Sequence, residues 1–445
     1  MTSVGPVAGQ HPADVPATGP SMDEAAALEL DRTDPLPTRR GEFHVPPDPS
    51  GRYADAAYFA GNSLGLQPKI LRERLAIELD DWAALGVEGH VEATHPWVSY
   101  HELLRDPAAR LVGAQPREVV VMNSLTVNLH LMMVSFYRPT PQRHAIVIED
   151  SAFPSDSYAV RSQAHWHGYD PDEAIIRLKP RAGESTLRSE DVVEFLATQG
   201  DRVALVLLGA VNYYSGEFLD IPAITAAGHA AGAVVGWDLA HAAGNLPLRL
   251  HDWDVDWAAW CSYKYLNSGP GALAGAFVHE KHLADRTLPK LAGWWSTDPA
   301  TRFQMAPEVT PVDSADAWQL SNPPILAMAP VLASLQMFDE VGLDALRDKS
   351  IRLTGYLERL LDEVCPGRAL EVITPRDPAR RGAQLSVRVG GVEAGKVSEI
   401  LRAEHGVFAD ARNPDVIRLA PVPMYCTFHD CWRAVTALAE VMDAQ

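Results

Sequence analysis

Short runs of apolar residues alternate with longer amphipathic stretches over most of this chain. The runs cover residues 118–122, 145–148, 203–208 and 233–237. They are apolar at nearly every position, which is typical of strands buried on both faces of a parallel sheet. Helical patterns lie around them at residues 69–85, from 126 onward and at 223–231. We therefore predict an α/β fold with a mainly parallel sheet, which collects ligands at the carboxyl ends of its strands.

The pattern changes after two consecutive prolines at positions 323 and 324. Long helical patterns follow, then a strand-like run, a shorter helix and a final helix, at residues 326–338, 346–363, 384–389, 392–405 and from 430 onward. We predict a large domain over residues 58–322 and a smaller α+β domain over 323–445, with residues 22–57 packing against the small domain. Residues 1–21 are rich in Pro, Gly, Ala, Ser and Thr and lack the regions of a signal peptide, so we predict a disordered extension there.

Charge and cysteine content narrow the class of function. The chain of 445 residues has 58 acidic and 38 basic side chains, and its net charge of −20 opposes binding to nucleic acid or anionic membranes. No stretch approaches the roughly 20 apolar residues of a membrane span. The four cysteines form no CxxC pair and have no zinc-ligand spacing, which favours reduced thiols in the cytoplasm and no bound metal. These features favour a small-molecule partner.

Lys264 and Asp238 are the strongest indication of chemistry. Lys264 follows the apolar segment 257–260 and lies between two tyrosines, where desolvation favours the neutral amine that forms a Schiff base with an aldehyde. Asp238 directly follows the apolar run at 233–237. Its carboxylate would pair with a pyridine nitrogen and keep that nitrogen protonated. Alone, the lysine would be a snorkelling surface residue and the aspartate a turn residue. Together they predict a pyridoxal phosphate site.

Two further segments follow predicted strands and suit the same cofactor. Ser124 to Thr126 open a helix, where backbone N–H groups and a hydroxyl can hold a phosphate, although a plain helix cap would give the same pattern. Phe153 to Asp156 offer an aromatic face and two polar groups. Core packing and a helix cap explain them equally well from the residues alone.

Several blocks of the chain resemble the kynureninases. They are residues 58–69, 122–130, 153–156, 260–271, 321–325 and 417–423, in the family's order from about residue 58 to the C-terminus. The resemblance implies a cytoplasmic, homodimeric fold type I enzyme with active sites at the dimer interface. It implies pyridoxal phosphate-dependent hydrolysis of L-kynurenine or L-3-hydroxykynurenine to an anthranilate and L-alanine. The implied pathways are tryptophan catabolism and the supply of precursors for NAD or secondary metabolites.

The resemblance also implies roles for individual residues. Lys264 would be the base, Asp238 the pyridinium partner and Tyr263 a phosphate ligand that moves protons. Trp294 and Asn322 would complete the cofactor site from the partner subunit. Gly209 stands where some members carry a cofactor-contacting serine, so we leave that contact unassigned. The full set of implied cofactor residues is Leu125, Thr126, Phe153, Pro154, Ser155, Asp156, Asp238, His241, Tyr263, Lys264, Trp294 and Asn322.

Arg418 is the candidate for binding the substrate carboxylate. Arginine grips a carboxylate with two parallel hydrogen bonds and keeps its charge, and in the apolar run 416–420 an unpaired guanidinium would be costly. A structural salt bridge is the alternative. Ser63, next to Asn62, would line the same end of the pocket.

Residues 89–91 and 321–322 also resemble family segments, and this resemblance implies that His90 and Asn322 face the ring of the substrate. Hydrogen bonds from them to a 3-hydroxyl would favour 3-hydroxykynurenine, because without the hydroxyl they would be left incompletely paired. The alternative for His90 is an ordinary surface or helix-end histidine.

Three other functions stay open on the sequence. They are a kynureninase relative acting on a modified kynurenine, another fold type I reaction such as that of a cysteine desulfurase or aminotransferase, and a module without catalysis. A desulfurase needs a reactive thiol, and Cys365 has no obvious activating neighbour. The presence of Lys264, Asp238 and Arg418 together argues against a module without catalysis.

Overall fold

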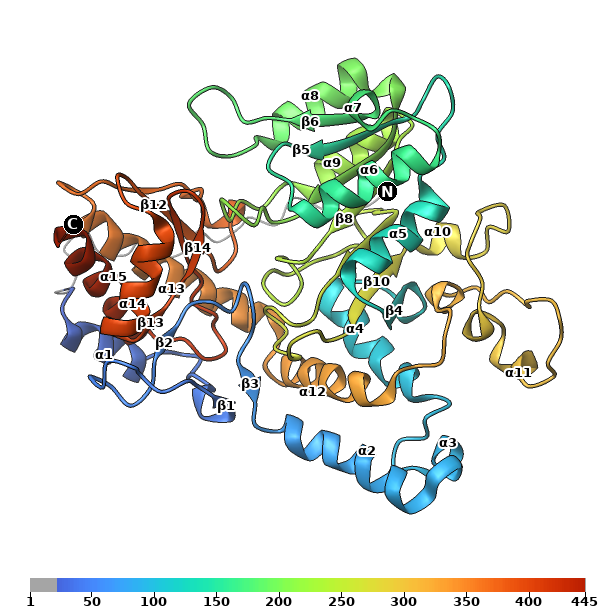
Figure 1. Cartoon of the computed structure of the whole chain (residues 1–445), viewed down its shortest axis with the longest axis horizontal. Coiled ribbons are helices and arrows are strands. Elements are labelled where there is room, and N and C mark those ends of the chain that lie inside the picture. Colours follow the sequence, from blue (N-terminus) through green and yellow to red (C-terminus); the bar gives the residue numbers. More distant parts are fainter. Residues whose placement is uncertain (1–21, 445) are drawn as a thin grey trace, which may run out of the picture.

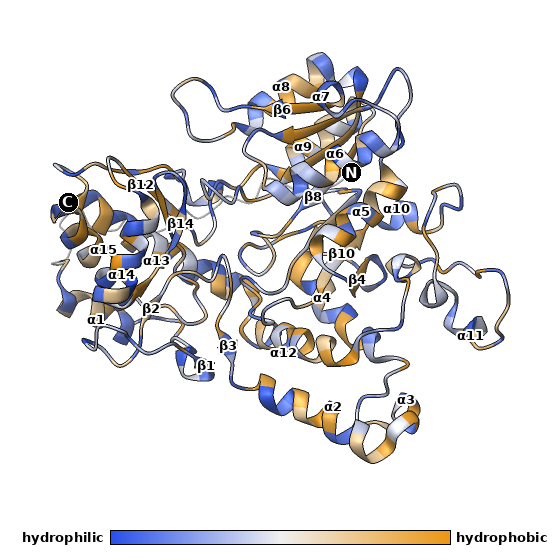
Figure 2. Cartoon of the chain, viewed as in Figure 1, coloured by the Kyte–Doolittle hydropathy of each residue, from blue (hydrophilic) through white to orange (hydrophobic). Residues whose placement is uncertain are grey.

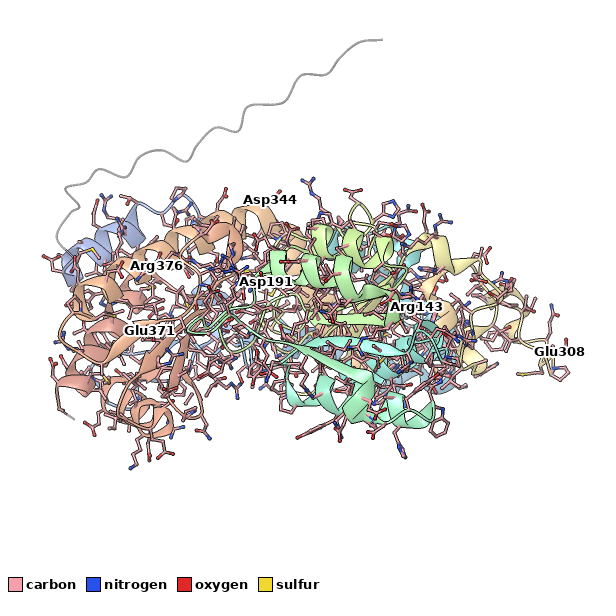
Figure 3. The ribbon with its side chains drawn as sticks, turned by 90° about the horizontal axis from the view of Figure 1, so that it is seen from above. Arg143, Asp191, Glu308, Asp344, Glu371 and Arg376 are labelled. Carbon is pink, nitrogen blue, oxygen red and sulfur yellow. The ribbon has the colours of Figure 1, made fainter. Side chains whose placement is uncertain are left out.

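Two bodies lie side by side in the protein, one built on a large sheet and the other on a small one (Figure 1). The computed structural model describes residues 22–444, so the extension predicted for residues 1–21 lies outside the described part. Figure 3 shows the same arrangement from above, with Glu371 and Arg376 on the small body and Glu308 at the opposite end of the molecule.

The large sheet has seven strands in the order β4-β10-β9-β8-β7-β5-β6. All neighbouring strands from β9 to β6 pair in parallel, whereas β10 is antiparallel to both β9 and β4. The predicted mainly parallel sheet is therefore present, but the run at 118–122 pairs with an antiparallel neighbour instead of a parallel one. The strands are β4 (Val119–Met122), β5 (Ala145–Glu149), β6 (Ile175–Leu178), β7 (Val203–Gly209), β8 (Val234–Asp238), β9 (Trp257–Trp260) and β10 (Ala274–Val278).

Each strand of this sheet sends alternate side chains into two different cores. Val119 and Val121 of β4 belong to one core cluster, and Val120 and Met122 belong to the other. Burial on both faces explains the continuous apolar runs in the sequence, which are orange in Figure 2. The first core, which contains Val119 and Val121, also contains side chains of the helices α4 (Arg105–Val112), α8 (Ser189–Gln199), α9 (Ile221–Ala230) and α12 (Ile325–Val341). The second core, which contains Val120 and Met122, also contains side chains of α5 (Leu125–Phe136) and α6 (Pro154–Trp166).

The small body is built on an antiparallel sheet of four strands. Its order is β11 (Leu370–Val372), β12 (Leu385–Val389), β15 (Val416–Leu419) and β14 (Asp410–Arg412). The helices α13 (Leu343–Val364), α14 (Ala394–His405) and α15 (Phe428–Asp443) pack on it, and α1 (Glu24–Arg32) packs against α15. A short pairing joins the N-terminal region to this body, because β2 (Ala57–Tyr58) runs parallel to β13 (Val407–Phe408). Within the N-terminal region itself, β1 (Phe43–His44) pairs with β3 (Gln67–Pro68).

Helix α12 belongs by packing to the large body, although its residues lie in the predicted small domain. Its buried side chains, such as Met328 and Leu335, join the first core, whereas Leu353 and Leu357 of α13 join the core of the small body. We therefore place the transition between the bodies within α13, and the division of the chain into domains remains a proposal.

Helix α2 (Leu71–Leu85) packs along α12 and extends away from both sheets to the short α3 (Gly89–Glu92) (Figure 1). Trp82 of α2 is 59% exposed.

Within residues 22–444, no single helix is long and apolar enough to cross a membrane, and α12 and α13 reach that standard only as a pair bent by 78°. The remaining short helices are α7 (Pro171–Ala174), α10 (Glu280–Leu283) and α11 (Pro299–Arg302).

Candidate active site

The carboxyl ends of the parallel strands surround a cavity of about 190 Å³. This is the edge where an open α/β sheet binds its ligands. The predicted residues that line the cavity are Leu125, Thr126, Phe153, Ser155, Asp156, Asp238, His241, Tyr263 and Lys264. Residues predicted from four separate segments of the chain therefore lie at one cavity. Ser124, Glu149, Gly209, Val211, Tyr213 and Ala240 complete the wall.

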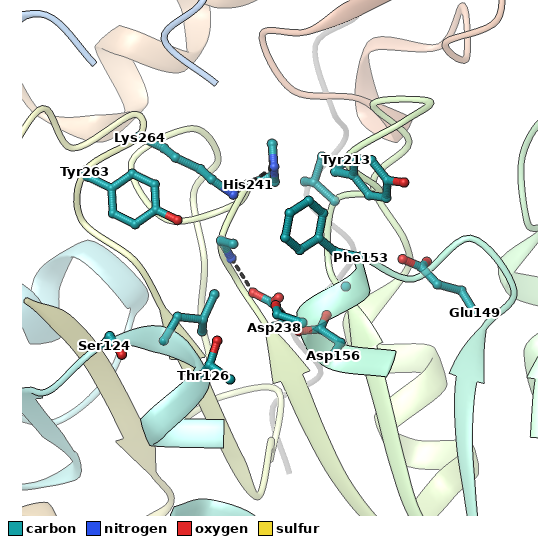
Figure 4. Close-up of a pocket in the computed structure, with 15 residues that line it drawn as sticks. Ser124, Thr126, Glu149, Phe153, Asp156, Tyr213, Asp238, His241, Tyr263 and Lys264 are labelled. Atoms are coloured by element: carbon teal, nitrogen blue, oxygen red, sulfur yellow. Dashed lines mark hydrogen bonds between the residues drawn. The ribbon is translucent and has the colours of Figure 1, made fainter. Parts of the chain in front are cut away.

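Lys264 projects into this cavity from the turn that follows β9 (Figure 4). Its Nζ lies 3.0 Å from Nε2 of His241 and 5.9 Å from the ring centroids of both Phe153 and Tyr263. Burial and the positive charge of Lys264 hold the pKa of His241 well below its usual value, so the imidazole is neutral. When Nε2 accepts a hydrogen from Lys264, the proton is on Nδ1, which is buried and has no partner among the described residues. A ligand in the cavity is the natural partner for that group.

Asp238 and Asp156 form a coupled carboxyl pair on the cavity floor (Figure 4). Asp238 is 7% exposed, and its Oδ1 accepts a hydrogen bond of 2.7 Å from the Ala240 backbone N–H. Burial raises the pKa of Asp156 well above its usual value, and the neighbouring Asp238 raises it further. Burial also raises the pKa of Asp238, but Lys264 and a hydrogen bond from Asp156 oppose that effect. Asp156 therefore keeps its proton more strongly, and Asp238 is the carboxyl that ionises first.

The start of α5 provides a second polar wall. Asn123 has φ of 51° and ends the strand sharply, held by a 3.0 Å hydrogen bond from its side chain to Oδ1 of Asn128. Ser124 then enters α5 with extended backbone and makes no capping hydrogen bond from its side chain within the described chain. The first N–H groups of the helix and the Thr126 hydroxyl thus face the cavity, as a phosphate group requires.

These features fit pyridoxal phosphate. The cavity has an amine for the aldehyde, a buried carboxylate for the pyridine nitrogen and a helix N-terminus for the phosphate. Phe153, which is 42% exposed, and Tyr263 flank the space from two sides. Burial raises the pKa of the Tyr263 phenol above its usual value, so this group keeps its proton at neutral pH.

Arg418 lies on β15 in the small body, outside the wall of this cavity. It is fully buried, pairs with Asp410 and donates a 2.7 Å hydrogen bond from Nη1 to the Tyr213 carbonyl. Tyr213 lines the cavity, so it connects Arg418 with the site. The structure thus contains the salt bridge that was the alternative for Arg418, and its substrate role stays a prediction. Ser63 and Asn62 also lie outside the wall, and Asn62 donates a 2.7 Å hydrogen bond to Gln384.

Four further predicted residues also do not line the cavity of their own chain. Pro154 is the first residue of α6, and His90 is an exposed residue of α3 whose ring meets Trp97 edge-on at 5.5 Å. Trp294 is 44% exposed, and Asn322 is also exposed. Their roles in binding stay predictions, which for Trp294 and Asn322 require a second subunit.

Glu149 and Tyr213 are the main cavity residues that sequence reasoning missed. Glu149 is the last residue of β5, and Tyr213 follows β7 by four positions. Both therefore carried the same signal as Asp238, a polar or aromatic side chain just after a buried strand.

Comparisons with known proteins agree with this geometry. The structure resembles a cysteine desulfurase from Thermococcus onnurineus, with a TM-score of 0.72 and 16% identity over 88% of this chain and 95% of that one. It also resembles the C-DES protein solved with glycine covalently linked to its PLP cofactor, with a TM-score of 0.72 and 18% identity over 87% and 97% of the two chains. At this identity the likeness concerns the fold, and it confirms the predicted fold type I architecture.

Sequence relatives are much more similar. A family model described as the kynureninase C-terminal domain matches residues 346–438. A kynureninase from Salinispora tropica is 67% identical over 95% of this chain and 98% of its own length. Kynureninases from Koribacter versatilis and Myxococcus xanthus are 57% and 55% identical, each over 93% of this chain and 96% of their own length. This chain therefore belongs to the kynureninase family.

Proposed function

We propose that the protein uses pyridoxal phosphate to hydrolyse L-kynurenine or L-3-hydroxykynurenine to an anthranilate and L-alanine. The observation that carries this proposal is the cavity in which Lys264, Asp238 and the start of α5 converge. Kynureninases at 55–67% identity over nearly the whole chain support the choice of substrate. Bound at this site, the cofactor would supply an electron sink that allows a carbon–carbon bond of the substrate to break.

The residues of the chain would then hold and move protons. The Lys264 amine would be the base that takes the proton from the substrate's α carbon. His241, only 3.0 Å from that amine, fixes its position. Ionised Asp238 holds the positive charge at the pyridine nitrogen, and the proton on Asp156 supports the ionised state of Asp238. Tyr263 keeps its phenol proton and is the donor we assign to the later protonation steps.

Arg418 is proposed to bind the substrate carboxylate. Its guanidinium is already held by Asp410 and by the Tyr213 carbonyl, so its orientation is fixed before substrate arrives. Nε of Arg418 is buried and has no partner among the described residues. Arg412 also pairs with Asp410, at 3.1 Å, so two guanidinium groups share one carboxylate and leave a net positive charge for an anion.

We further propose a homodimer that completes each site with residues of the partner subunit. Trp294 and Asn322 are exposed and lie outside the cavity of their own chain. An apolar hollow of about 450 Å³ between α2 and α12, lined by Trp82, Trp97 and Leu326 among others, offers a surface for the second copy.

A cysteine desulfurase is not favoured, despite the shared fold. Cys365 follows the last residue of α13, in the small body, and burial raises the pKa of its thiol, so the reactive thiolate is disfavoured. All four cysteines are free. Reduced thiols support our proposal of a cytoplasmic enzyme, and tryptophan catabolism with NAD precursor supply is the pathway we propose for it.

The test is an assay of the purified protein with kynurenine, 3-hydroxykynurenine and cysteine. We expect equal amounts of alanine and the matching anthranilate from the first two substrates and no alanine from cysteine. Release of alanine from cysteine, with neither kynurenine cleaved, would overturn the proposal.

The same assay tests the ring preference. We expect a higher kcat/KM for 3-hydroxykynurenine, by about ten- to a hundredfold. The reason is that His90 and Asn322, once covered by the substrate ring in the proposed dimer, would be left without a partner when the hydroxyl is missing, at a cost of about 1–3 kcal/mol. His90→Phe should remove most of that difference. A preference for unsubstituted kynurenine that His90→Phe leaves unchanged contradicts the role of His90, but not the reaction.

A further inference from the structure

Three neighbouring strands end at the cavity in Glu149, Gly209 and Asp238. These are the last residues of β5, β7 and β8, which are adjacent in the sheet in that order. Gly209 pairs in register with Asp238, and all three residues line the cavity. The middle strand thus has no side chain between the two acids. Figure 4 shows the Glu149 side chain on the far side of Asp238 and Asp156 from Lys264.

The Glu149 carboxyl uses the space that the glycine leaves open. A Cβ placed on Gly209 would lie 3.2 Å from Oε1 of Glu149 and 3.7 Å from the Val211 carbonyl. The φ of Gly209 lies outside the left-handed region, so the backbone itself does not demand glycine there. What the glycine provides is room for the carboxyl of Glu149 at the cavity wall.

Glu149 is held there as a neutral acid. It is 5% exposed and forms no ion pair within residues 22–444. Burial raises its pKa to about 8, and the negative charges of Asp238 and Glu217 add to that effect, although a hydrogen bond with Asn212 opposes it. At neutral pH its carboxyl therefore keeps a proton and can donate a hydrogen bond, which an ionised carboxylate cannot do.

We propose that Glu149 is an additional cofactor-site residue, whose carboxyl donates a hydrogen bond into the cavity beside Asp238 from the place left open at Gly209. This inference rests on the proposed function, since it assumes that pyridoxal phosphate occupies the cavity. A neutral Glu149 leaves Asp238 as the one ionised carboxyl at the pyridine nitrogen. A second negative charge there would repel the phosphate and compete for the pyridinium charge. Glu149 is thus a positioning residue for the cofactor.

The experiment measures the Kd of pyridoxal phosphate for the apoprotein by absorbance titration, in wild type and three variants. Glu149→Gln keeps the size of the side chain and a neutral donor, so we expect a Kd within twofold of wild type. Glu149→Ala removes the donor, so we expect binding at least fivefold weaker. Gly209→Ala places a methyl group 3.2 Å from Oε1 of Glu149, so the carboxyl must shift, and we expect weaker binding of the cofactor.

Glu217→Gln is the matched control. Glu217 is also a buried glutamate with a raised pKa, about 7, but it bonds to Arg380 at 2.6 Å and does not line the cavity. Its substitution should leave the Kd within twofold of wild type, although it removes an ion pair and a minor electrostatic effect on Glu149, because burial is the largest cause of the raised pKa of Glu149 and does not change. This control separates an effect at the cavity from a general loss of a buried carboxyl.

Two results would overturn the inference. One is Glu149→Ala with a Kd within twofold of wild type, and the other is Glu149→Gln as weak as Glu149→Ala, because a neutral donor would then not be the active feature. If circular dichroism shows that Glu149→Ala does not fold, Gly209→Ala decides, and an unchanged Kd overturns the inference. A wild-type protein that binds no pyridoxal phosphate refutes the proposed function instead.

Discussion

Asp238→Asn isolates the negative charge on the cavity floor from the shape of the side chain. The amide has the size of the carboxylate, and its oxygen can still accept the 2.7 Å hydrogen bond from the Ala240 backbone N–H. The local turn should therefore survive. What disappears is the ionised partner of the pyridine nitrogen, in a position that is only 7% exposed.

The size of the effect follows from that burial. A hydrogen bond to a charged group is worth about 1.5–3 kcal/mol in a buried site, and each 1.4 kcal/mol changes a dissociation constant about tenfold. We therefore expect pyridoxal phosphate to bind about ten- to a hundredfold more weakly. Turnover should fall further than binding, because the neutral amide cannot hold the ring nitrogen protonated during bond cleavage.

The assay is an absorbance titration of the apoprotein, followed by the rate of anthranilate release at saturating cofactor. Asp220→Asn is the control. The Asp220 side chain also accepts a hydrogen bond from a backbone N–H, that of Ala223 at 3.0 Å, but it lies outside the cavity. If Asp238→Asn binds the cofactor and turns over kynurenine within twofold of wild type, Asp238 is not the pyridinium partner.

Three further substitutions test other parts of the account. Lys264→Ala should abolish turnover while leaving circular dichroism unchanged, and measurable kynurenine cleavage by this variant would contradict its role as the base. Arg418→Lys should raise KM about tenfold or more with a smaller change in kcat, because lysine cannot grip a carboxylate with two parallel bonds, and an unchanged KM removes Arg418 from the substrate site. Burial alone would raise the pKa of Asp256, but hydrogen bonds from His229 and His282 lower it below its usual value of 3.8. The ionised carboxylate should therefore stabilise the fold fully above pH 3.8, and this stabilisation should be lost as the pH falls below that value. Asp256→Asn should lower the free energy of unfolding at pH 7 by about 2–3 kcal/mol in urea titrations, and an unchanged value would show that these hydrogen bonds contribute nothing.

The sequence predicted four of the strands that are buried on both faces, β4, β5, β7 and β8, because their apolar runs are continuous. It did not assign the buried strands β9 and β10. It missed β6 as an element of the sheet, since Ile175–Leu178 is an edge strand of half-buried residues with an arginine among them. It also gave β4 a parallel neighbour, because the direction of β10 depends on the path of the chain and not on local composition.

Some residues of the candidate site were predicted from the sequence and others were missed. Asp238 and Lys264 carried recognisable chemistry at the ends of apolar segments, and the structure brings them to one cavity. Glu149 was missed although it ends a predicted strand as Asp238 does, and only the space beside Gly209 on the neighbouring strand shows where its carboxyl lies. Trp294 and Asn322 lie outside the cavity of their own chain, and their roles remain part of the proposed dimer.

The most direct test of the central claim is the identity of the lysine that holds the cofactor. Borohydride reduction of the purified holoenzyme fixes pyridoxal phosphate to the amine that carries it, and peptide mapping by mass spectrometry then locates the modified residue. The account predicts a single modified peptide carrying the cofactor on Lys264. Attachment to another lysine, or no attachment in a protein that still cleaves kynurenine, would contradict it.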